Sequence, residues 1–373
     1  NVDDHNNHNN CDGDRDDDND DNIGNVDAAT TTSAPSASPS PLSSSLLSSL
    51  GAWIDNIRDN VHSNCTCMHI AAQQNHIHCM EVLLSYGASI DPLDNIRATP
   101  LFYAAVSGSE EAATFLLHHG AQVNHKDMYN NFPVFLALKN RHYPMVDLFL
   151  LFGANLYLKT SRGNCLHRLA ESGNISAMKY LISKHQFSPF RLNDHEQNVL
   201  YSALSHLKVV RYLLRRCDLK KLLIQAVDHK KRNIFHACCL GSYLDSMIDI
   251  LTACVSVYPD ETELLLNAKD MNGITPLMMA CKSKDYDSLR FLSLCSSVNV
   301  NAQDNNGNTA LHMAIKAKDM EAIQTLITHG GAKISIRNKW KISCKRMAKQ
   351  EGIQLPESSA EEEEERSARN NEM

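Results

Sequence analysis

The chain has 373 residues, 43% of them hydrophobic, and its 36 Lys and Arg against 43 Asp and Glu leave a net charge of −7. A chain of this length and apolar content can bury a substantial core. Its longest apolar runs fall well short of the ~20 residues that a membrane-spanning helix needs, and its polar, acidic N-terminus lacks the apolar region of a secretory signal. The composition therefore argues against a membrane-spanning or secreted protein.

Residues 1–45 and 357–373 are predicted to be disordered acidic tails. The first segment contains Asp, Asn and His runs followed by a Ser/Thr/Pro/Ala stretch, and such sequences bury too little apolar surface to fold. Residues 1–27 carry −9 and residues 357–373 carry −5, so the rest of the chain is mildly basic at +7. Solvated ends are the simplest interpretation. The alternative is that a tail competes with an acidic partner for a basic face.

Residues 46–64 are expected to hold an N-terminal capping helix. Apolar residues recur there at helical spacing, and an array of stacked units needs a cover over its open core. These residues are Leu46, Leu47, Leu50, Trp53, Ile54 and Ile57.

From residue 65 to residue 356 one pattern recurs with a spacing of 32 to 42 residues, and its clearest copy runs from Asn308 to Ala332. Thr309 can begin a helix, because its hydroxyl accepts a hydrogen bond from an unpaired backbone N–H. Two short apolar helix patterns follow, and Gly330 and Gly331 end the second. The corresponding start positions are Thr66, Thr99, Phe132, Asn164, Asn198, Asn233, Thr275, Thr309 and Ser343. Such short helix pairs cannot bury their apolar faces alone, so the repeat predicts a solenoid.

Several segments carry a resemblance to the ankyrin-repeat family over about residues 60–350. They are T-C-M-H-I-A-A from Thr66, T-P-L-F-Y-A-A from Thr99, C-L-H-R-L-A from Cys165, T-P-L-M-M-A from Thr275 and T-A-L-H-M-A from Thr309. The helix endings with Gly-Ala at Gly87, Gly120, Gly153 and Gly331 are also similar to that family's. The resemblance implies an all-α ankyrin-repeat solenoid of about eight helix–turn–helix repeats with β-turn fingers.

Residues 198–266 depart from the regular spacing. The fifth repeat, from Asn198, lacks two residues between its helices, and the sixth, from Asn233, contains an extra segment at residues 253–266. We expect these neighbours to bend the stack or to divide it into two blocks. Residues 337–352 are expected to form a degenerate C-terminal cap, since Lys345 and Arg346 replace an apolar residue and a His.

A row of positions, each one residue after the signature His, is the predicted binding surface. The resemblance implies that this row lies on the inner helices and is variable, and apolar or aromatic side chains there resemble the anchors of interfaces. The alternative is that neighbouring helices half-bury these side chains. The candidates from the row are Ile70, Tyr103, Leu136, Arg168, Met279 and Met313, and those from a finger turn are Met128 and Tyr129.

No site for chemistry is predicted. Zinc prefers four Cys or His ligands, and six candidates lie close together in the sequence: Cys65, Cys67, His69, His76, His78 and Cys79. However, they belong to two different helices, and His69 is part of the repeat signature. We therefore expect structural packing and no metal or cofactor there, and the same holds for His5, His8 and Cys11. Motifs of hydrolases, metalloproteases and nucleotide-binding enzymes are absent. Basic clusters at residues 211–221, 230–232 and 339–349 are interpreted as solvated helix faces and not as a nucleic-acid site.

The resemblance implies a non-enzymatic scaffold or adaptor that binds a protein partner on its concave inner-helix and finger surface. The alternative is a regulatory or substrate-recognition array of a larger protein, such as a ubiquitin-ligase receptor, a kinase or an acyltransferase, because the chain begins with Asn1 and not with Met. The 12 cysteines follow no disulfide framework, which favours a reducing compartment, the cytoplasm or the nucleus.

Overall fold

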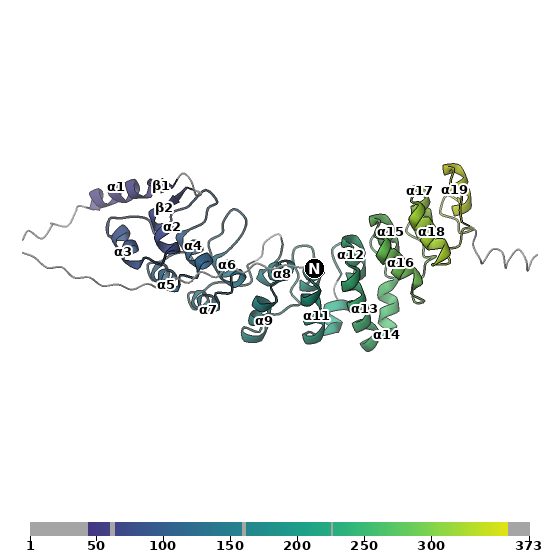
Figure 1. Ribbon diagram of the computed structural model, residues 1–373, viewed down its shortest axis with the longest axis horizontal. Helices are drawn as coiled ribbons and strands as arrows, with labels where there is room; N and C mark the ends of the chain where they lie inside the picture. Colours follow the sequence, from purple (N-terminus) through teal and green to yellow (C-terminus); the bar gives the residue numbers. More distant parts are fainter. Residues whose placement is uncertain (1–43, 60–63, 159–161, 225–226, 357–373) are drawn as a thin grey trace, which may run out of the picture. The chain divides into compact units, whose positions relative to one another are not determined.

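The computed structural model describes residues 44–59, 64–158, 162–224 and 227–356, and the regular secondary structure of this part of the chain is almost entirely helical (Figure 1). The predictions for the two tails, including His5, His8 and Cys11, lie outside the described residues. Successive units of two helices joined by a short turn follow one another along the chain. The pairs are α2 (Cys67–Gln73) and α3 (Ile77–Ser85), α4 (Pro100–Ser107) and α5 (Glu110–His118), α6 (Pro133–Lys139) and α7 (Tyr143–Leu151), α8 (Cys165–Glu171) and α9 (Ile175–Lys184), α10 (Val199–Ala203) and α11 (Leu207–Arg216), α12 (Ile234–Gly241) and α13 (Leu244–Val257), α15 (Pro276–Ser283) and α16 (Tyr286–Leu294), and α17 (Ala310–Lys316) and α18 (Met320–Thr328). The prediction of an all-α repeat solenoid is confirmed.

The first helix of every unit begins at a predicted start position. All nine of those residues, from Thr66 to Ser343, are the N-caps of the helices that follow them. Asn233, for example, accepts the backbone N–H of His236 at 3.2 Å through its side-chain oxygen. Where the unit starts with Phe132 there is no capping side chain, but Pro133 occupies the first turn, where its missing N–H leaves no donor unpaired.

Four buried histidines tie a helix start to the next unit. In His69, His236 and His312 the ring Nδ1 accepts the backbone N–H of the N-cap residue, so Nε2 carries the proton and donates it. The Nε2 acceptors are the carbonyl oxygens of Ala98 for His69, Gln197 for His167, Ile274 for His236 and Ile342 for His312, at 2.9 to 3.1 Å. Burial lowers the pKa of His69, His236 and His312, because a charged ring loses its hydration there.

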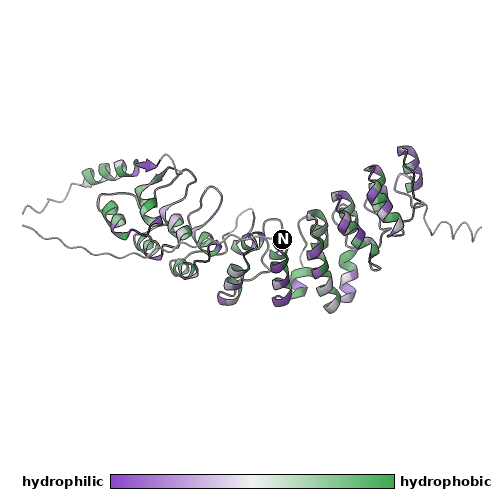
Figure 2. Ribbon diagram, in the orientation of Figure 1, coloured by the Kyte–Doolittle hydropathy of each residue, from purple (hydrophilic) through white to green (hydrophobic). Residues whose placement is uncertain are grey.

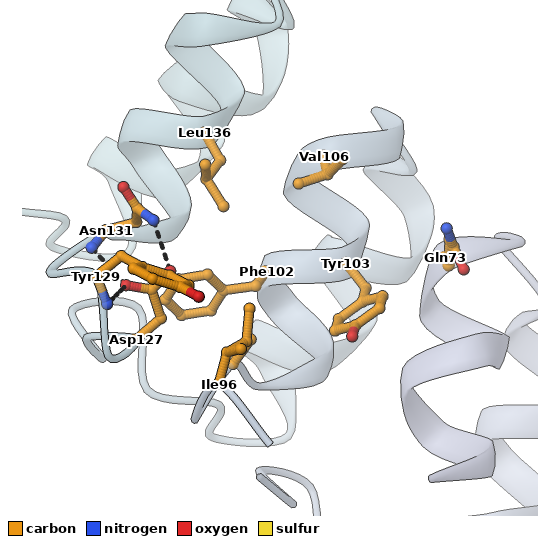
Figure 3. Close-up of a pocket in the computed structure, with 10 residues that line it drawn as sticks. Gln73, Ile96, Phe102, Tyr103, Val106, Asp127, Tyr129, Asn131 and Leu136 are labelled. Carbon is orange, nitrogen blue, oxygen red and sulfur yellow. Dashed lines mark hydrogen bonds between the residues drawn. The ribbon is translucent and has the colours of Figure 1, made fainter. Parts of the chain in front are cut away.

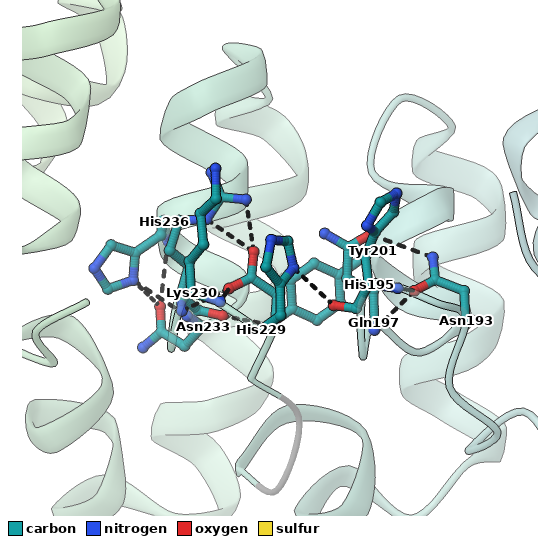
Figure 4. Close-up of polar contacts among 10 residues, drawn as sticks. Asn193, His195, Gln197, Tyr201, His229, Lys230, Asn233 and His236 are labelled. Carbon is teal, nitrogen blue, oxygen red and sulfur yellow. Dashed lines mark hydrogen bonds and ion pairs between the residues drawn. The ribbon is translucent and has the colours of Figure 1, made fainter. Parts of the chain in front are cut away.

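The finger turns are organised by one Asp or Asn each. The side-chain oxygen of Asp304 accepts the N–H groups of Asn306 at 2.8 Å and Asn308 at 2.7 Å, which is an Asx-type turn. The same pair of bonds recurs at Asp94, Asp127, Asn193, Asp228, Asp270 and Asn338. Figure 4 shows the polar contacts where the turn before α10 meets the turn before α12. Backbone hydrogen bonds join the tips of adjacent turns in several places, as from the N–H of Asn305 to the carbonyl oxygen of Asn272 at 3.0 Å.

Stacking of the first helices is not uniform. α4 packs on α2 and α6, α8 packs on α10, and α15 packs on α12 and α17, which in turn packs on α19 (Cys344–Glu351). By contrast, α6 and α8 make little direct contact, and the same is true of α10 and α12. The second of these junctions lies in the predicted irregular region, whereas the first was not predicted. At the first junction side chains join the units: the rings of Tyr143 and Tyr180 stack at 4.4 Å, and the hydroxyl of Tyr180 donates to Asp147 at 2.6 Å.

The irregular repeats differ in their helices. α10 has only five residues, and a short π-helix, η1 (Lys220–Ile224), follows α11. The inserted residues of the sixth repeat lengthen α13 to fourteen residues and then form an additional helix, α14 (Pro259–Leu266). At the end of the array α19 buries only Cys344 and Ala348 and is largely hydrophilic (Figure 2).

The N-terminal end of the array is covered by α1 (Ser44–Asp55), which ends earlier than the capping segment expected at residues 46–64. Gly51 of α1 lies directly against Gly87 at the end of the first unit, and Asp55 accepts the N–H of Ser89 at 3.1 Å. Leu46 and Trp53 remain exposed. Two short strands follow, β1 (Arg58–Asp59) and β2 (Cys65–Thr66), paired antiparallel with Arg58 opposite Thr66.

Cys165, Cys238, Cys239, Cys281 and Cys344 are free and buried. Burial raises the pKa of the Cys165 and Cys281 thiols to about 12, so these side chains act as small apolar groups. None of the described helices is both long enough and apolar enough to cross a membrane.

Candidate protein-binding surface

The predicted inner row is only partly exposed. Ile70 is 43% exposed, whereas Tyr103, Leu136 and Met313 are half-buried. Met279 is only 7% exposed, because α15 packs closely against α12. Its selection as a binding residue is therefore corrected: Met279 belongs to the core.

A pocket of about 280 Å³ lies between α4, α6 and the two turns beside them (Figure 3). It unites three of the predicted residues, since Tyr103 comes from α4, Leu136 from α6 and Tyr129 from the turn before α6. Val106 and Leu136 face each other across the pocket. Its other lining residues are Gln73, Ile96, Ala98, Phe102, Asp127 and Asn131.

Tyr103 is held rigidly at one wall. Its hydroxyl donates to the Asp94 carboxylate at 2.8 Å and lies 2.9 Å from the Cys65 sulfur. Its ring meets the buried His69 ring edge-on, with 5.0 Å between the ring centres. Burial, together with hydrogen bonds to Cys65 and Asp94, raises the pKa of Tyr103. The phenol therefore stays neutral and offers its ring to the pocket.

The opposite rim is formed by a finger turn. One oxygen of Asp127 accepts the N–H groups of Tyr129 at 2.9 Å and Asn131 at 2.7 Å, and the other accepts the Asn131 side-chain amide at 2.6 Å. The N–H of Met128 donates to the carbonyl oxygen of Ile96 at 2.8 Å and so joins the two turns. Met128 is 56% and Tyr129 64% exposed. The backbone of this rim is fixed while both large side chains stay accessible.

Arg168 lies on α8, in the predicted row, but its side chain is bonded to the neighbouring repeat. Its guanidinium lies over the Phe135 ring at 3.8 Å and donates to the carbonyl oxygen of Asn130 at 3.2 Å and to the side-chain oxygen of Asn131 at 2.5 Å. It is half-buried. Arg168 thus joins the fourth unit to the turn that bounds the pocket, and it is less available to a partner than a free surface arginine.

Three matches to a family described as "Ankyrin repeats (3 copies)" cover residues 43–127, 134–222 and 234–338, which is most of the chain. The chain belongs to the ankyrin-repeat family. Members of this family generally act as binding modules and not as enzymes.

Individual relatives are similar to shorter parts of this ankyrin-repeat chain. Ankyrin repeat and SOCS box protein 5 of Mus musculus is 29% identical over 124 residues, which is 33% of this chain and 37% of that protein. Ankyrin repeat and SOCS box protein 11 of Mus musculus is 29% identical over 103 residues, 28% of this chain and 32% of that protein. SH3 and multiple ankyrin repeat domains protein 2 of Homo sapiens is 29% identical over 119 residues, 31% of this chain and 6% of that protein. The matched segments thus cover about a third or less of these relatives.

Two of the six Cys and His residues between Cys65 and Cys79 are engaged within the ankyrin array. His69 is bonded to Thr66 and Ala98, and the Cys65 sulfur to Tyr103. In the part of the chain that the structure describes, no three His, Cys, Asp or Glu side chains are grouped as metal ligands.

Two pocket residues, Ile96 and Val106, were missed by sequence reasoning. Val106 follows Tyr103 by three positions, so helical geometry places both on one face of α4. It is 47% exposed, and extending the inner row by one turn would have found it. Ile96 follows Asp94 by two positions, as the predicted Tyr129 follows Asp127, so comparing the two finger turns would have found it.

Proposed function

We propose that this ankyrin-repeat chain is a protein-interaction scaffold or adaptor whose partner binds to the inner-helix and finger surface of repeats one to four. The observation that carries the proposal is the pocket in which Tyr103, Tyr129 and Leu136 meet. Apolar and aromatic side chains around a preformed pocket are the usual anchors of an interface. Because the turn bonds of Asp94 and Asp127 already order the pocket walls, a partner need not bear the entropy of ordering them.

The pocket favours an extended segment with an apolar or aromatic anchor residue. Its volume of about 280 Å³ suits one large side chain and not a whole helix face. Ile70, Met128 and Tyr129 are exposed around it and would contact residues that flank the anchor. Met313 lies in another part of the array and is not required for this interaction.

The test is affinity capture with the immobilised full chain and its Tyr103→Ala/Leu136→Ala variant. Proteins captured by the wild type should be lost with this variant and kept with Leu151→Ala, which changes a side chain that is 84% exposed on α7. A second variant, Val106→Ser/Tyr129→Ala, alters exposed side chains and leaves the Tyr103 hydrogen bonds intact. If both variants capture the same proteins as the wild type, the surface assignment is wrong.

The alternative proposal is a recognition array within a larger protein, such as a ubiquitin-ligase receptor, a kinase or an acyltransferase. Two relatives are named for a SOCS box in addition to ankyrin repeats, and this chain matches about a third of each. Sequencing the full-length transcript tests it: an added adaptor or catalytic domain would favour this alternative over a free-standing scaffold. Free, buried thiols such as those of Cys165, Cys238 and Cys281 support a cytoplasmic or nuclear location for either form.

A further inference from the structure

A second groove crosses the last three units of the array, α15, α17 and α19. It has a volume of about 690 Å³, and Met313, Ile342 and Met347 lie on its apolar side. Trp340, in the last finger turn, also lines it and is 63% exposed. This groove shares no lining residue with the pocket of repeats one to three.

The rim of this groove carries unmatched positive charge. Lys282 and Lys284 at the end of α15 and Lys316 at the end of α17 line it and are exposed. Across the described residues, no carboxylate lies within 4.0 Å of these three ammonium groups.

The two acidic residues that also line the groove are already engaged. Asp304 accepts the turn N–H groups, and Glu351 pairs with Lys318 at 3.1 Å. Residues 274–356 contain twelve Lys and Arg against six Asp and Glu, a net charge of +6. The groove therefore fits a ligand that brings carboxylates.

The chain itself supplies such a segment next to the groove. Residues 357–373 contain seven Glu and two Arg, and five of the Glu are consecutive, from Glu361 to Glu365. Gln350 and Glu351 line the groove, so the segment leaves the fold a few residues away. Residues 352–356 belong to the fold, since the N–H of Ile353 donates to Ala348 at 2.9 Å and Leu355 packs against the core. The five residues from Pro356 to Glu361 reach up to about 17 Å when extended and the nine to Glu365 up to about 30 Å, against the ~16–20 Å of two helix-packing distances from α19 to α15.

We propose that residues 357–373 bind back across this groove, with the carboxylates of Glu361–Glu365 beside Lys282, Lys284 and Lys316. Each exposed ion pair is weak and is screened by salt, but a short tether gives the segment an effective concentration in the millimolar range. The segment thereby acts as a built-in competitor for any acidic peptide that could use the groove. This inference does not depend on the function proposed for the pocket of repeats one to four.

The first test follows Trp340 in the full chain. The only other tryptophan is Trp53, so a Trp53→Phe background isolates the Trp340 fluorescence. With the segment bound, quenching by neutral acrylamide should be weaker than in a variant with Glu361–Glu365 all changed to Gln. About 1 M NaCl, where the Debye length is about 3 Å, should abolish that difference. Equal quenching of the two proteins at low salt would overturn the proposal. The five changes leave the sequence of residues 44–356 unaltered.

The second test measures binding of a synthetic peptide of residues 357–373. The full chain with Glu361–Glu365 changed to Gln should bind it about tenfold or more tightly than the wild type, whose own segment competes. Adding Lys282→Glu and Lys316→Glu should abolish binding. Lys284 is left unchanged because it ends α15 in a left-handed conformation. The matched control is Arg215→Glu/Arg216→Glu. It also replaces two exposed basic residues by Glu, but in the last turn of α11.

Three results would contradict the proposal. They are no peptide binding by the Gln variant, equal binding by wild type and Gln variant, and unchanged binding after the two lysine substitutions. Shielding of Trp340 that increases with protein concentration, with a matching rise in mass by sedimentation, would assign the groove to the segment of a second copy and also overturn binding within one chain.

Discussion

The guanidinium of Arg168 lies 3.8 Å from the centre of the Phe135 ring, across a junction where the first helices α6 and α8 make little direct contact. The same group donates to Asn130 and Asn131 in the turn of the third repeat. Where helix packing is thin, this side chain is therefore one of the contacts that connect repeats three and four, beside the Tyr143–Tyr180 stack.

Arg168→Ala should lower the free energy of unfolding by about 1–3 kcal/mol, because it removes a cation–π contact and two hydrogen bonds. Urea denaturation followed by circular dichroism measures this loss. Arg162→Ala is the control: its side chain is 71% exposed and pairs with Glu171 at 3.6 Å, so its effect should stay below about 0.5 kcal/mol. Equal effects of the two changes would show that Arg168 does not hold the junction.

Stability should fall as the pH drops below the ordinary pKa of histidine, about 6.5. Burial lowers the pKa of His69, His236 and His312 in the fold. Between the lowered and the ordinary value the unfolded chain binds more protons than the folded one, so each histidine destabilises the fold by up to about 1.4 kcal/mol per pH unit. Above pH ~6.5 both states are neutral at these positions and this contribution vanishes.

Urea unfolding at a series of pH values from about 7.5 down to about 5 tests this dependence. His312→Gln keeps a side chain capable of hydrogen bonding but cannot titrate, so the variant should show a shallower decrease than the wild type. A stability that stays constant or rises over this range would rule out the histidines as buried neutral groups.

Asp228→Asn should lower the free energy of unfolding far more than the same change at Asp304. Both carboxylates accept two turn N–H groups, and Asn193 and Asn338 show that an amide can do this in the same array. Asp228, however, is almost fully buried and also accepts two hydrogen-bonding contacts from Arg232, at 2.8 Å and 2.6 Å.

We therefore expect Asp228→Asn to cost about 3 kcal/mol, since it leaves the cation of Arg232 without its partner. Asp304→Asn should cost less than about 1 kcal/mol. Thermal and urea unfolding of the two variants give the comparison, and similar losses would mean that the ion pair adds nothing to the turn.

Gly51→Ala should destabilise the N-terminal end of the array. An added Cβ at Gly51 would overlap the backbone carbonyl of Gly87, and such overpacking costs about 1–3 kcal/mol. Helix propensity alone predicts the opposite sign, a gain of up to about 1 kcal/mol for Ala over Gly. Unfolding measurements combined with limited proteolysis of α1 distinguish the expected loss of stability from the expected gain. Ser49→Ala, an exposed change in the same helix, should leave stability nearly unchanged.

The pocket between α4 and α6 shows how far a prediction from the sequence reaches. Tyr103 and Leu136 were chosen from their repeat positions and Tyr129 from a finger turn, and all three line this pocket. Met279 occupies the equivalent position in the seventh repeat but is buried. The repeat pattern assigns a side chain to a face, whereas its exposure depends on how closely the next unit packs, and that distance depends on side chains from both units.

The sequence by itself determined the periodic architecture and the start of every first helix, because capping residues and the turn-forming Asp and Asn act through bonds to backbone only a few residues away. Tertiary structure alone decided which repeat junctions pack tightly and which side chains of the inner row stay exposed. Those outcomes depend on contacts between residues some thirty or more positions apart, whose geometry follows from the packing of whole units and not from any local pattern.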